Sequence, residues 1–177
     1  MLGYAHRYKA ELEELYQTKV LGNDYYKYWM FGSYWDLELD KGSESSEWSY
    51  IRRVSLNKEG KVIAYFKAHI QRPENRADSF SILSLDNSNG ILLLKDLSQF
   101  IDDLFMKHQM YKISFVVVKN NPAKKIYDKF IAKANGRVVG VREKDVLLTD
   151  NKFYDVIMYE VLRENYIMSK ESNINEC

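Results

Sequence analysis

Apolar residues recur along the chain at two spacings, one typical of helices and the other of strands. Residues 5–21 carry apolar side chains among acidic ones at helical spacing, which predicts an N-terminal helix. Residues 48–56 and 61–70 are rich in β-branched and aromatic side chains. Because the turn sequence 57–60 lies between them, the two segments predict an antiparallel hairpin.

The second half of the chain alternates strands and helices. A strand is predicted over 79–85, after a polar loop at 71–78, and a helix over 91–108 with Leu94, Leu97, Ile101, Leu104 and Phe105 on its buried face. The remaining predicted elements are a strand at 113–118, a helix that begins near 120 and ends at Asn135-Gly136, and strands at 137–143 and 153–162.

This order predicts an α+β fold in one domain over residues 1–165. Residues 1–47 form its helical and aromatic segment, and residues 48–165 form the sheet core. Residues 166–177 are expected to be a C-terminal tail. A chain of 177 residues is long enough to bury a substantial core in one domain.

Composition restricts the partners and the compartment. The formal net charge is +1, so no overall field attracts nucleic acid or an anionic membrane, and neither is expected as a partner. No apolar run is long enough to span a bilayer. The single cysteine, Cys177, is the last residue, which excludes a disulfide within the chain and favours a cytoplasmic location.

The helix behind strand 113–118 carries the most informative residues. Ala123, Ile126, Tyr127, Phe130, Ile131 and Ala134 recur at helical spacing and define its inward face. Tyr127 is therefore expected on the inward face, about one turn from the end of a buried strand. It is either a core tyrosine or a phenol that meets a ligand lodged beside the strand.

The pattern Asn120, Ala123, Tyr127 and Lys129 behind an apolar strand resembles the second half of the GCN5-related N-acetyltransferase (GNAT) family. The resemblance covers about residues 50–163. It implies a GNAT-like mixed, mostly antiparallel central sheet flanked by helices. It also implies acetyl-CoA as acyl donor and a small-molecule or peptide amine as acceptor. No metal is expected, since no His/Cys cluster has zinc spacing.

The family places the cofactor diphosphate at a Gln/Arg-x-x-Gly-x-Gly/Ala turn before a helix, where amides and the helix dipole favour anions. Here Asn87, Gly90 and Leu92 occupy those positions, and only the central glycine is kept. The turn is therefore either the diphosphate site or an ordinary Asx/Gly turn. The cofactor-binding residues that the resemblance implies are Leu83, Ser84, Leu85, Asn87, Ser88, Asn89, Gly90, Ile91, Leu92, Asn120 and Ala123.

In the implied reaction an amine attacks the thioester directly. Backbone donors of residues 83–85 would polarise its carbonyl, and Tyr127 would protonate the leaving thiolate. Asn120 either holds the pantetheine arm or caps the helix. No residue stands out as the base, since His69 is a lone histidine and Asp78 and Asp86 only flank the strand.

The aromatic segment 25–35 would lie on the acceptor side, where rings could bind a cationic amine; the alternatives are core packing and a homodimer contact. RNA binding is disfavoured because no basic patch accompanies these rings. The rival to catalysis is an inactive GNAT-fold binding or dimerisation module. The altered turn and the lack of a carboxylate within strand 79–85 favour this rival.

Overall fold

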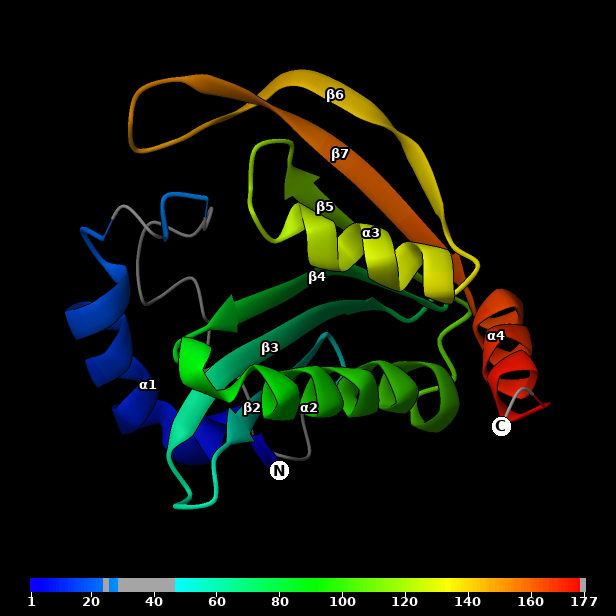
Figure 1. The fold of residues 1–177 in the computed structure, drawn as a ribbon, viewed down its shortest axis with the longest axis horizontal. Helices are drawn as coiled ribbons and strands as arrows, with labels where there is room; N and C mark the ends of the chain where they lie inside the picture. The colour runs from blue at the N-terminus through cyan, green and yellow to red at the C-terminus, as the bar shows by residue number, and fades with distance from the viewer. Residues whose placement is uncertain (24–25, 29–46, 176–177) are drawn as a thin grey trace.

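The computed structural model describes residues 1–23, 26–28 and 47–175. Within these residues, seven strands form one sheet in the order β1-β2-β3-β4-β5-β7-β6 (Figure 1). The strands are β1 (Leu2–Tyr4), β2 (Tyr50–Leu56), β3 (Val62–Gln71), β4 (Arg76–Ser84), β5 (Lys112–Val118), β6 (Arg137–Leu147) and β7 (Phe153–Leu162). The α-helices are α1 (Lys9–Leu15), α2 (Gly90–Asp102), α3 (Lys124–Lys133) and α4 (Arg163–Asn175).

Every pair of neighbouring strands is antiparallel except β4 and β5. These two strands are parallel and are connected through α2, because parallel neighbours need a crossover rather than a tight turn. The predicted α+β fold, with a mixed and mostly antiparallel sheet flanked by helices, is confirmed.

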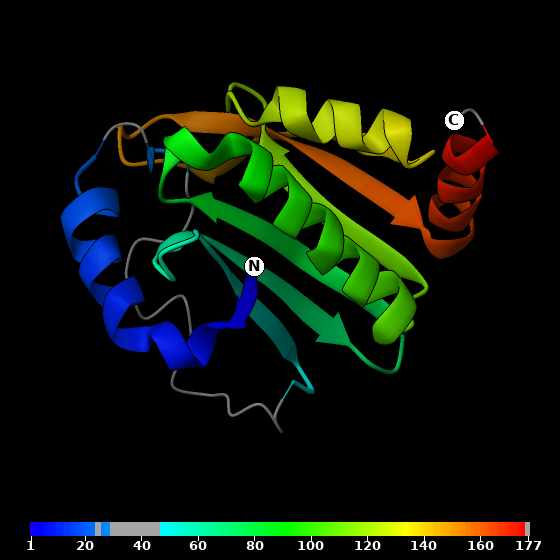
Figure 2. The ribbon, with the colours of Figure 1, turned by 60° about the horizontal axis from the view of Figure 1, so that its bottom comes forward.

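Apolar side chains cover both faces of the sheet, since successive residues of a strand point to opposite sides. One cluster lies under α2 and α3, which cover the same face (Figures 1 and 2). The other packs α1 against β2, β3 and β4. The first includes Phe66, Phe80, Phe100, Phe115 and Tyr127, and the second includes Leu12, Tyr16, Val54, Tyr65 and Leu83.

The predicted hairpin and the strands after it are present, with differences at element ends. The helix predicted over 5–21 consists of a 3-10 turn (Ala5–Tyr8), α1 and a π-helical turn (Tyr16–Val20). β4 begins at Arg76, so the last part of the predicted loop belongs to the strand. Within the predicted Asn135-Gly136 ending of α3, Asn135 is the residue that adopts the left-handed conformation (φ 49°).

Two differences concern helices. Leu94, predicted to be inward, is 52% exposed, whereas Phe100 is fully buried. The cause is packing, since the Phe100 ring lies between those of Phe66 (5.5 Å) and Phe80 (5.9 Å). The chain after Asn165, expected to be a tail, continues α4, where Tyr166 is buried and stacks on Phe105 with ring centroids 4.7 Å apart.

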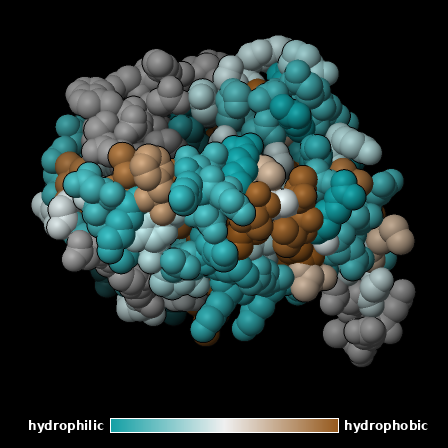
Figure 3. Space-filling view, turned by 90° about the horizontal axis from the view of Figure 1, so that it is seen from above, coloured by the Kyte–Doolittle hydropathy of each residue, from teal (hydrophilic) through white to brown (hydrophobic). Residues whose placement is uncertain are grey.

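The outer strand β6 leaves an apolar surface. Val138, Val139 and Val141 are each more than half exposed, and Figure 3 shows apolar atoms in the middle of the face seen from above, where β6 and β7 lie. The homodimer left open by the sequence stays a prediction. Among the described residues, no helix combines the length and the apolar character needed to cross a membrane.

Candidate active site

The sheet divides between β4 and β5. The ladder that joins these two strands, both fully described, contains two residue pairs: Arg76 with Lys112, and Ala77 with Ile113. Beyond these pairs β4 stays bonded to β3 and β5 to β7, so the two strands diverge (Figure 1). We call the diverging segments, residues 78–84 and 114–118, the fork. At its narrow end the Ser114 hydroxyl donates a 2.5 Å hydrogen bond to Asp78.

A β-bulge lies at the narrow end of the fork. The register between β3 and β4 shifts between Lys67 and His69, and Ser79 has a φ of 50°. A bulge reorients the side chains that follow it. Phe80 consequently packs on the side of α2, where its ring lies 5.7 Å from that of Phe115 on β5.

Backbone groups of β4 alternate between β3 and the fork. The Leu85 N–H donates to the Ile63 carbonyl at 2.8 Å, so by alternation Leu83 and Leu85 direct their backbone groups toward β3. Ser84 faces the other way, and its carbonyl accepts a 2.9 Å hydrogen bond from the Tyr26 hydroxyl. Of the three residues predicted to polarise the thioester, Ser84 is the one whose backbone faces the fork.

Asp86 caps the turn between β4 and α2. Its carboxylate accepts hydrogen bonds from the Ser88 N–H (2.8 Å), the Ser88 hydroxyl (2.7 Å) and the Asn89 side-chain amide (2.8 Å). These contacts, the Ser88 hydroxyl foremost, hold the pKa of Asp86 below its ordinary value. The Ser88 amide, one of the predicted phosphate donors, is therefore occupied by a carboxylate.

Gly90 is the first residue of α2, with a φ of −54° that any residue can adopt. A Cβ added at Gly90 would meet no atom within 4 Å. The space outside Gly90 is thus open to a ligand, although neither the backbone nor a neighbour requires glycine. Ile91 is 89% exposed and Leu92 is partly buried, while the Asn87 side chain lies outside the described part.

Tyr127 lies on the inward face of α3, as predicted. It is 9% exposed, its ring centroid is 5.0 Å from that of Phe115, and burial raises its pKa above the ordinary value. Among the described residues, none forms a hydrogen bond with its hydroxyl. The other buried tyrosines on this face differ, because Tyr159 donates to Asp128 at 2.7 Å and Tyr166 to Asp102 at 2.9 Å. The inward position predicted for Ile126 is wrong, since it is 46% exposed.

The two asparagines before α3 have different surroundings. The Asn121 carboxamide accepts a 2.9 Å hydrogen bond from the N–H of Ala123, the residue that precedes α3. Asn120, predicted to be a cap or a pantetheine ligand, is exposed, and Ala123 rather than Asn120 occupies the N-cap position of α3. Ala123 is partly buried and packs against the apolar cluster beneath α3.

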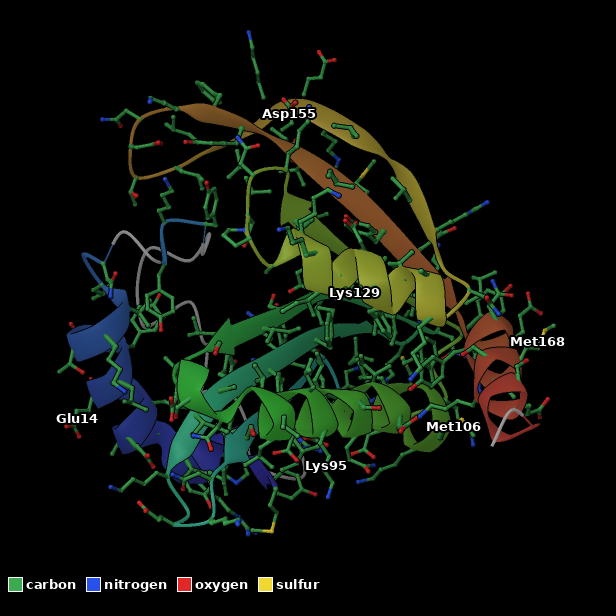
Figure 4. All side chains as sticks on the ribbon, viewed as in Figure 1. Glu14, Lys95, Met106, Lys129, Asp155 and Met168 are labelled. Atoms are coloured by element: carbon green, nitrogen blue, oxygen red, sulfur yellow. The ribbon has the colours of Figure 1, made fainter. Side chains whose placement is uncertain are left out.

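Several lysines surround the fork. The Lys19 ammonium lies 3.5 Å from the carbonyl of Leu85, at the end of β4. Lys124 forms an ion pair with Asp128 at 2.6 Å, and Lys125 is exposed. Lys129, the last residue of the α3 pattern, is exposed on that helix (Figure 4).

The candidate bases His69 and Asp78 both contact neighbouring side chains. His69 stacks on Tyr50 with ring centroids 4.8 Å apart and lies opposite Asp78 in the ladder. Asp78 also accepts a 3.0 Å hydrogen bond from Arg76. The Asp78–Ser114 contact is not predicted from the sequence. The predicted crossover helix could have indicated it, because such a helix brings the starts of two parallel strands side by side. Most of the aromatic segment 25–35 lies outside the described residues.

Comparison with known proteins establishes the fold. No protein-family model matches the chain, and no curated protein sequence matches it. Among solved structures, spermidine/spermine N-acetyltransferase SpeG from Vibrio cholerae, in complex with manganese ions, has a TM-score of 0.70 at 17% identity and covers 94% of each chain. A chimera of the Vibrio cholerae SpeG with hSSAT has a TM-score of 0.72 at 17% identity, covering 94% of this chain and 98% of that one.

The protein therefore has the fold of the spermidine N-acetyltransferases, and the GNAT-like architecture expected from the sequence is confirmed. Identity at this level establishes the fold alone. In the described part of the chain, no group of three or more His, Cys, Asp or Glu side chains could hold a metal ion.

Proposed function

We propose that the protein is an acetyl-CoA-dependent N-acetyltransferase that acts on a primary amine. The observation that carries the proposal is Tyr127, whose side chain is 9% exposed and lies beside Phe115 at the fork, and whose hydroxyl has no partner among the described residues. The fold shared with spermidine N-acetyltransferases supports the same activity.

Residues at the fork suit an extended ligand with a thioester at one end and phosphates at the other. Acetyl-CoA supplies an acetyl group activated as a thioester. The backbone N–H of Ser84 would bind the arm, beside the carbonyl that accepts from Tyr26, and the start of α2 at Gly90 would receive the diphosphate because amides and open space meet there. Lys19 offers a positive charge near the same end of β4.

Tyr127 would act as the general acid. Because burial raises its pKa, the phenol keeps its proton at Oη throughout the neutral range. A raised pKa also weakens the acid, so proton transfer requires a thiolate that is itself desolvated and therefore more basic. The interior under α3 provides such surroundings, since Phe115, Phe130 and Ile131 belong to the same apolar cluster.

The acceptor is a primary amine. Polyamines are the first candidates to test, because the solved structures of similar fold are named spermidine N-acetyltransferases. With Asp78 bound to Ser114 and Arg76, the amine proton would leave most simply to water.

Thermal unfolding and turnover test the proposal together. Acetyl-CoA at millimolar concentration should raise the unfolding midpoint, because a ligand that binds the folded state stabilises it. Thiol release should then follow the addition of an acceptor from a panel of polyamines, amino-terminal peptides and other primary amines. A midpoint that acetyl-CoA leaves unchanged would rule out the proposed activity.

A catalytically inactive binding or dimerisation module is the second candidate. The observation that favours it is the Asp86 carboxylate, which occupies the Ser88 amide and places negative charge beside the expected diphosphate site. Acetyl-CoA binding without thiol release for any amine, together with a stable dimer in solution, would support this candidate.

A further inference from the structure

We propose that Phe80 and Phe115 limit the transferred group to acetyl by closing the narrow end of the fork. The inference rests on the proposed function and adds to it the class of acyl donor: short acyl thioesters are accepted, and propionyl and longer chains are discriminated against.

The two rings meet across the fork. The last ladder pair is Ala77 with Ile113, and immediately beyond it Phe80 and Phe115 extend from the two diverging strands toward α2 and α3. Their centroids are 5.7 Å apart in an edge-to-face arrangement, a favourable geometry for two aromatic rings. They are 4% and 2% exposed. The contact therefore closes the fork on its helix-covered side.

Neither ring is free to move aside. Behind Phe80 the Phe100 ring is stacked at 5.9 Å, and behind Phe115 the Tyr159 ring is stacked at 5.2 Å. Displacing either ring would disturb a close-packed row, which interiors resist. At the same level, the Asp78–Ser114 hydrogen bond joins the two strands through side chains.

The position of Tyr127 places the acyl group next to this aromatic contact. To give its proton to the leaving sulfur, the hydroxyl must come within hydrogen-bond reach of it, about 3 Å. The Tyr127 ring is 5.0 Å from Phe115, so the sulfur and its acyl group lie beside the Phe115 side chain. A longer chain would extend toward the contact between Phe115 and Phe80. Exclusion of one methylene by an apolar pocket typically changes specificity by about 10–200-fold.

The test compares Phe80→Leu and Phe115→Leu with Phe66→Leu as a matched control. Phe66 is fully buried in the same cluster and stacks on Phe100 at 5.5 Å, but it lies on β3, which β4 separates from β5. For each protein, kcat/KM is measured with acetyl-, propionyl- and butyryl-CoA, and dissociation constants for the three thioesters are measured by calorimetry. Thermal midpoints identify variants that fail to fold.

We expect wild type to prefer acetyl-CoA over propionyl-CoA by at least about tenfold. Phe80→Leu and Phe115→Leu should reduce this preference by about tenfold. Phe66→Leu should leave the preference unchanged, even if it lowers the thermal midpoint by as much as the two fork variants do. The wild-type profile is decisive if both fork variants unfold, because equal kcat/KM for acetyl- and butyryl-CoA would overturn the inference.

The outcomes distinguish this inference from the proposed function. Acetyl transfer with no dependence on chain length, or with equal shifts in all three variants, would overturn the inference and leave the activity standing. If no thioester is turned over but binding is seen, equal dissociation constants for the three thioesters would overturn it. Tighter binding of acetyl-CoA, relaxed only in the two fork variants, would support it without turnover. A protein that binds no thioester would overturn both.

Discussion

Tyr127→Phe and Tyr159→Phe should separate catalysis from stability. Both tyrosines are buried beside Phe115, with ring centroids 5.0 Å and 5.2 Å from it. Their hydroxyls differ, because Tyr159 donates to Asp128 at 2.7 Å whereas the Tyr127 hydroxyl bonds to none of the described residues. Each substitution removes one oxygen atom and preserves the ring, so packing is equal in the two variants.

The expected magnitudes follow from those partners. Tyr127→Phe removes a general acid, which should lower turnover by about 10²–10⁴-fold. It should leave the free energy of unfolding within about 0.5 kcal/mol of wild type or raise it, because no described hydrogen bond is lost. Tyr159→Phe removes a hydrogen bond to a carboxylate, generally about 1.5–3 kcal/mol. We expect a loss at the lower end of this range for Tyr159→Phe, since Asp128 is 43% exposed and keeps its ion pair with Lys124 at 2.6 Å.

Three measurements check this pair of predictions: thiol release at saturating substrates, acetyl-CoA affinity by calorimetry, and urea denaturation. Tyr127→Phe should keep the affinity while losing turnover, and Tyr159→Phe should keep both while unfolding at lower urea. Equal turnover in wild type and Tyr127→Phe would remove Tyr127 from the mechanism. A loss of more than about 1 kcal/mol in Tyr127→Phe would show that its hydroxyl has a structural role.

Further predictions concern the cofactor turn and its surroundings. Gly90→Ala should stabilise the protein by about 0.4–1 kcal/mol, since its φ suits alanine and an added Cβ meets nothing, yet it should weaken acetyl-CoA binding roughly tenfold in calorimetry. Gly136→Ala should destabilise by about 1–3 kcal/mol in urea, because its Cβ would lie 2.8 Å from the Glu160 carbonyl oxygen. Asp86→Ala should lose a cap worth about 1 kcal/mol. The pKa of Asp86 is lowered from 3.8 in the folded protein. The stability difference between wild type and Asp86→Ala should therefore be complete above pH 3.8 and should disappear as the pH falls through the lowered pKa. Denaturation at several pH values would measure this difference. If the difference between wild type and Asp86→Ala stays constant down to low pH, the cap is not ionic.

The sequence predicts strands β2 to β7 because their patterns have one interpretation, whereas the three-residue strand β1 is not predicted. Residues 113–118 are apolar apart from Ser114, and β5 is bonded along its length to β7 with α3 over one face. The phase of α2 is different. Three leucines stand together at 92–94, so spacing alone does not decide which of them faces the sheet. Packing decides it through Phe100, which lies between Phe66 and Phe80.

The fork itself is not visible in the sequence. Where two strands separate depends on their partners on the other side, and those partners come from distant parts of the chain. Asp78 and Ser114 are 36 residues apart and meet only because the crossover through α2 aligns the starts of β4 and β5. The turn before α3 is ambiguous for a local reason, since two adjacent asparagines precede Pro122 and only Asn121 lies two residues before the Ala123 amide that it bonds.

Residues that stability does not require distinguish a working transferase from a protein that keeps only this fold. Folding alone does not require the hydroxyl at position 127, because it has no partner among the described residues. Folding would also favour a helix former at position 90, where neither φ nor any neighbour demands glycine. Tyr127 would meet the thioester end of the ligand and Gly90 its diphosphate end. Because folding requires neither the Tyr127 hydroxyl nor a glycine at position 90, and the two residues suit opposite ends of one ligand, we propose that the fork serves catalysis rather than assembly.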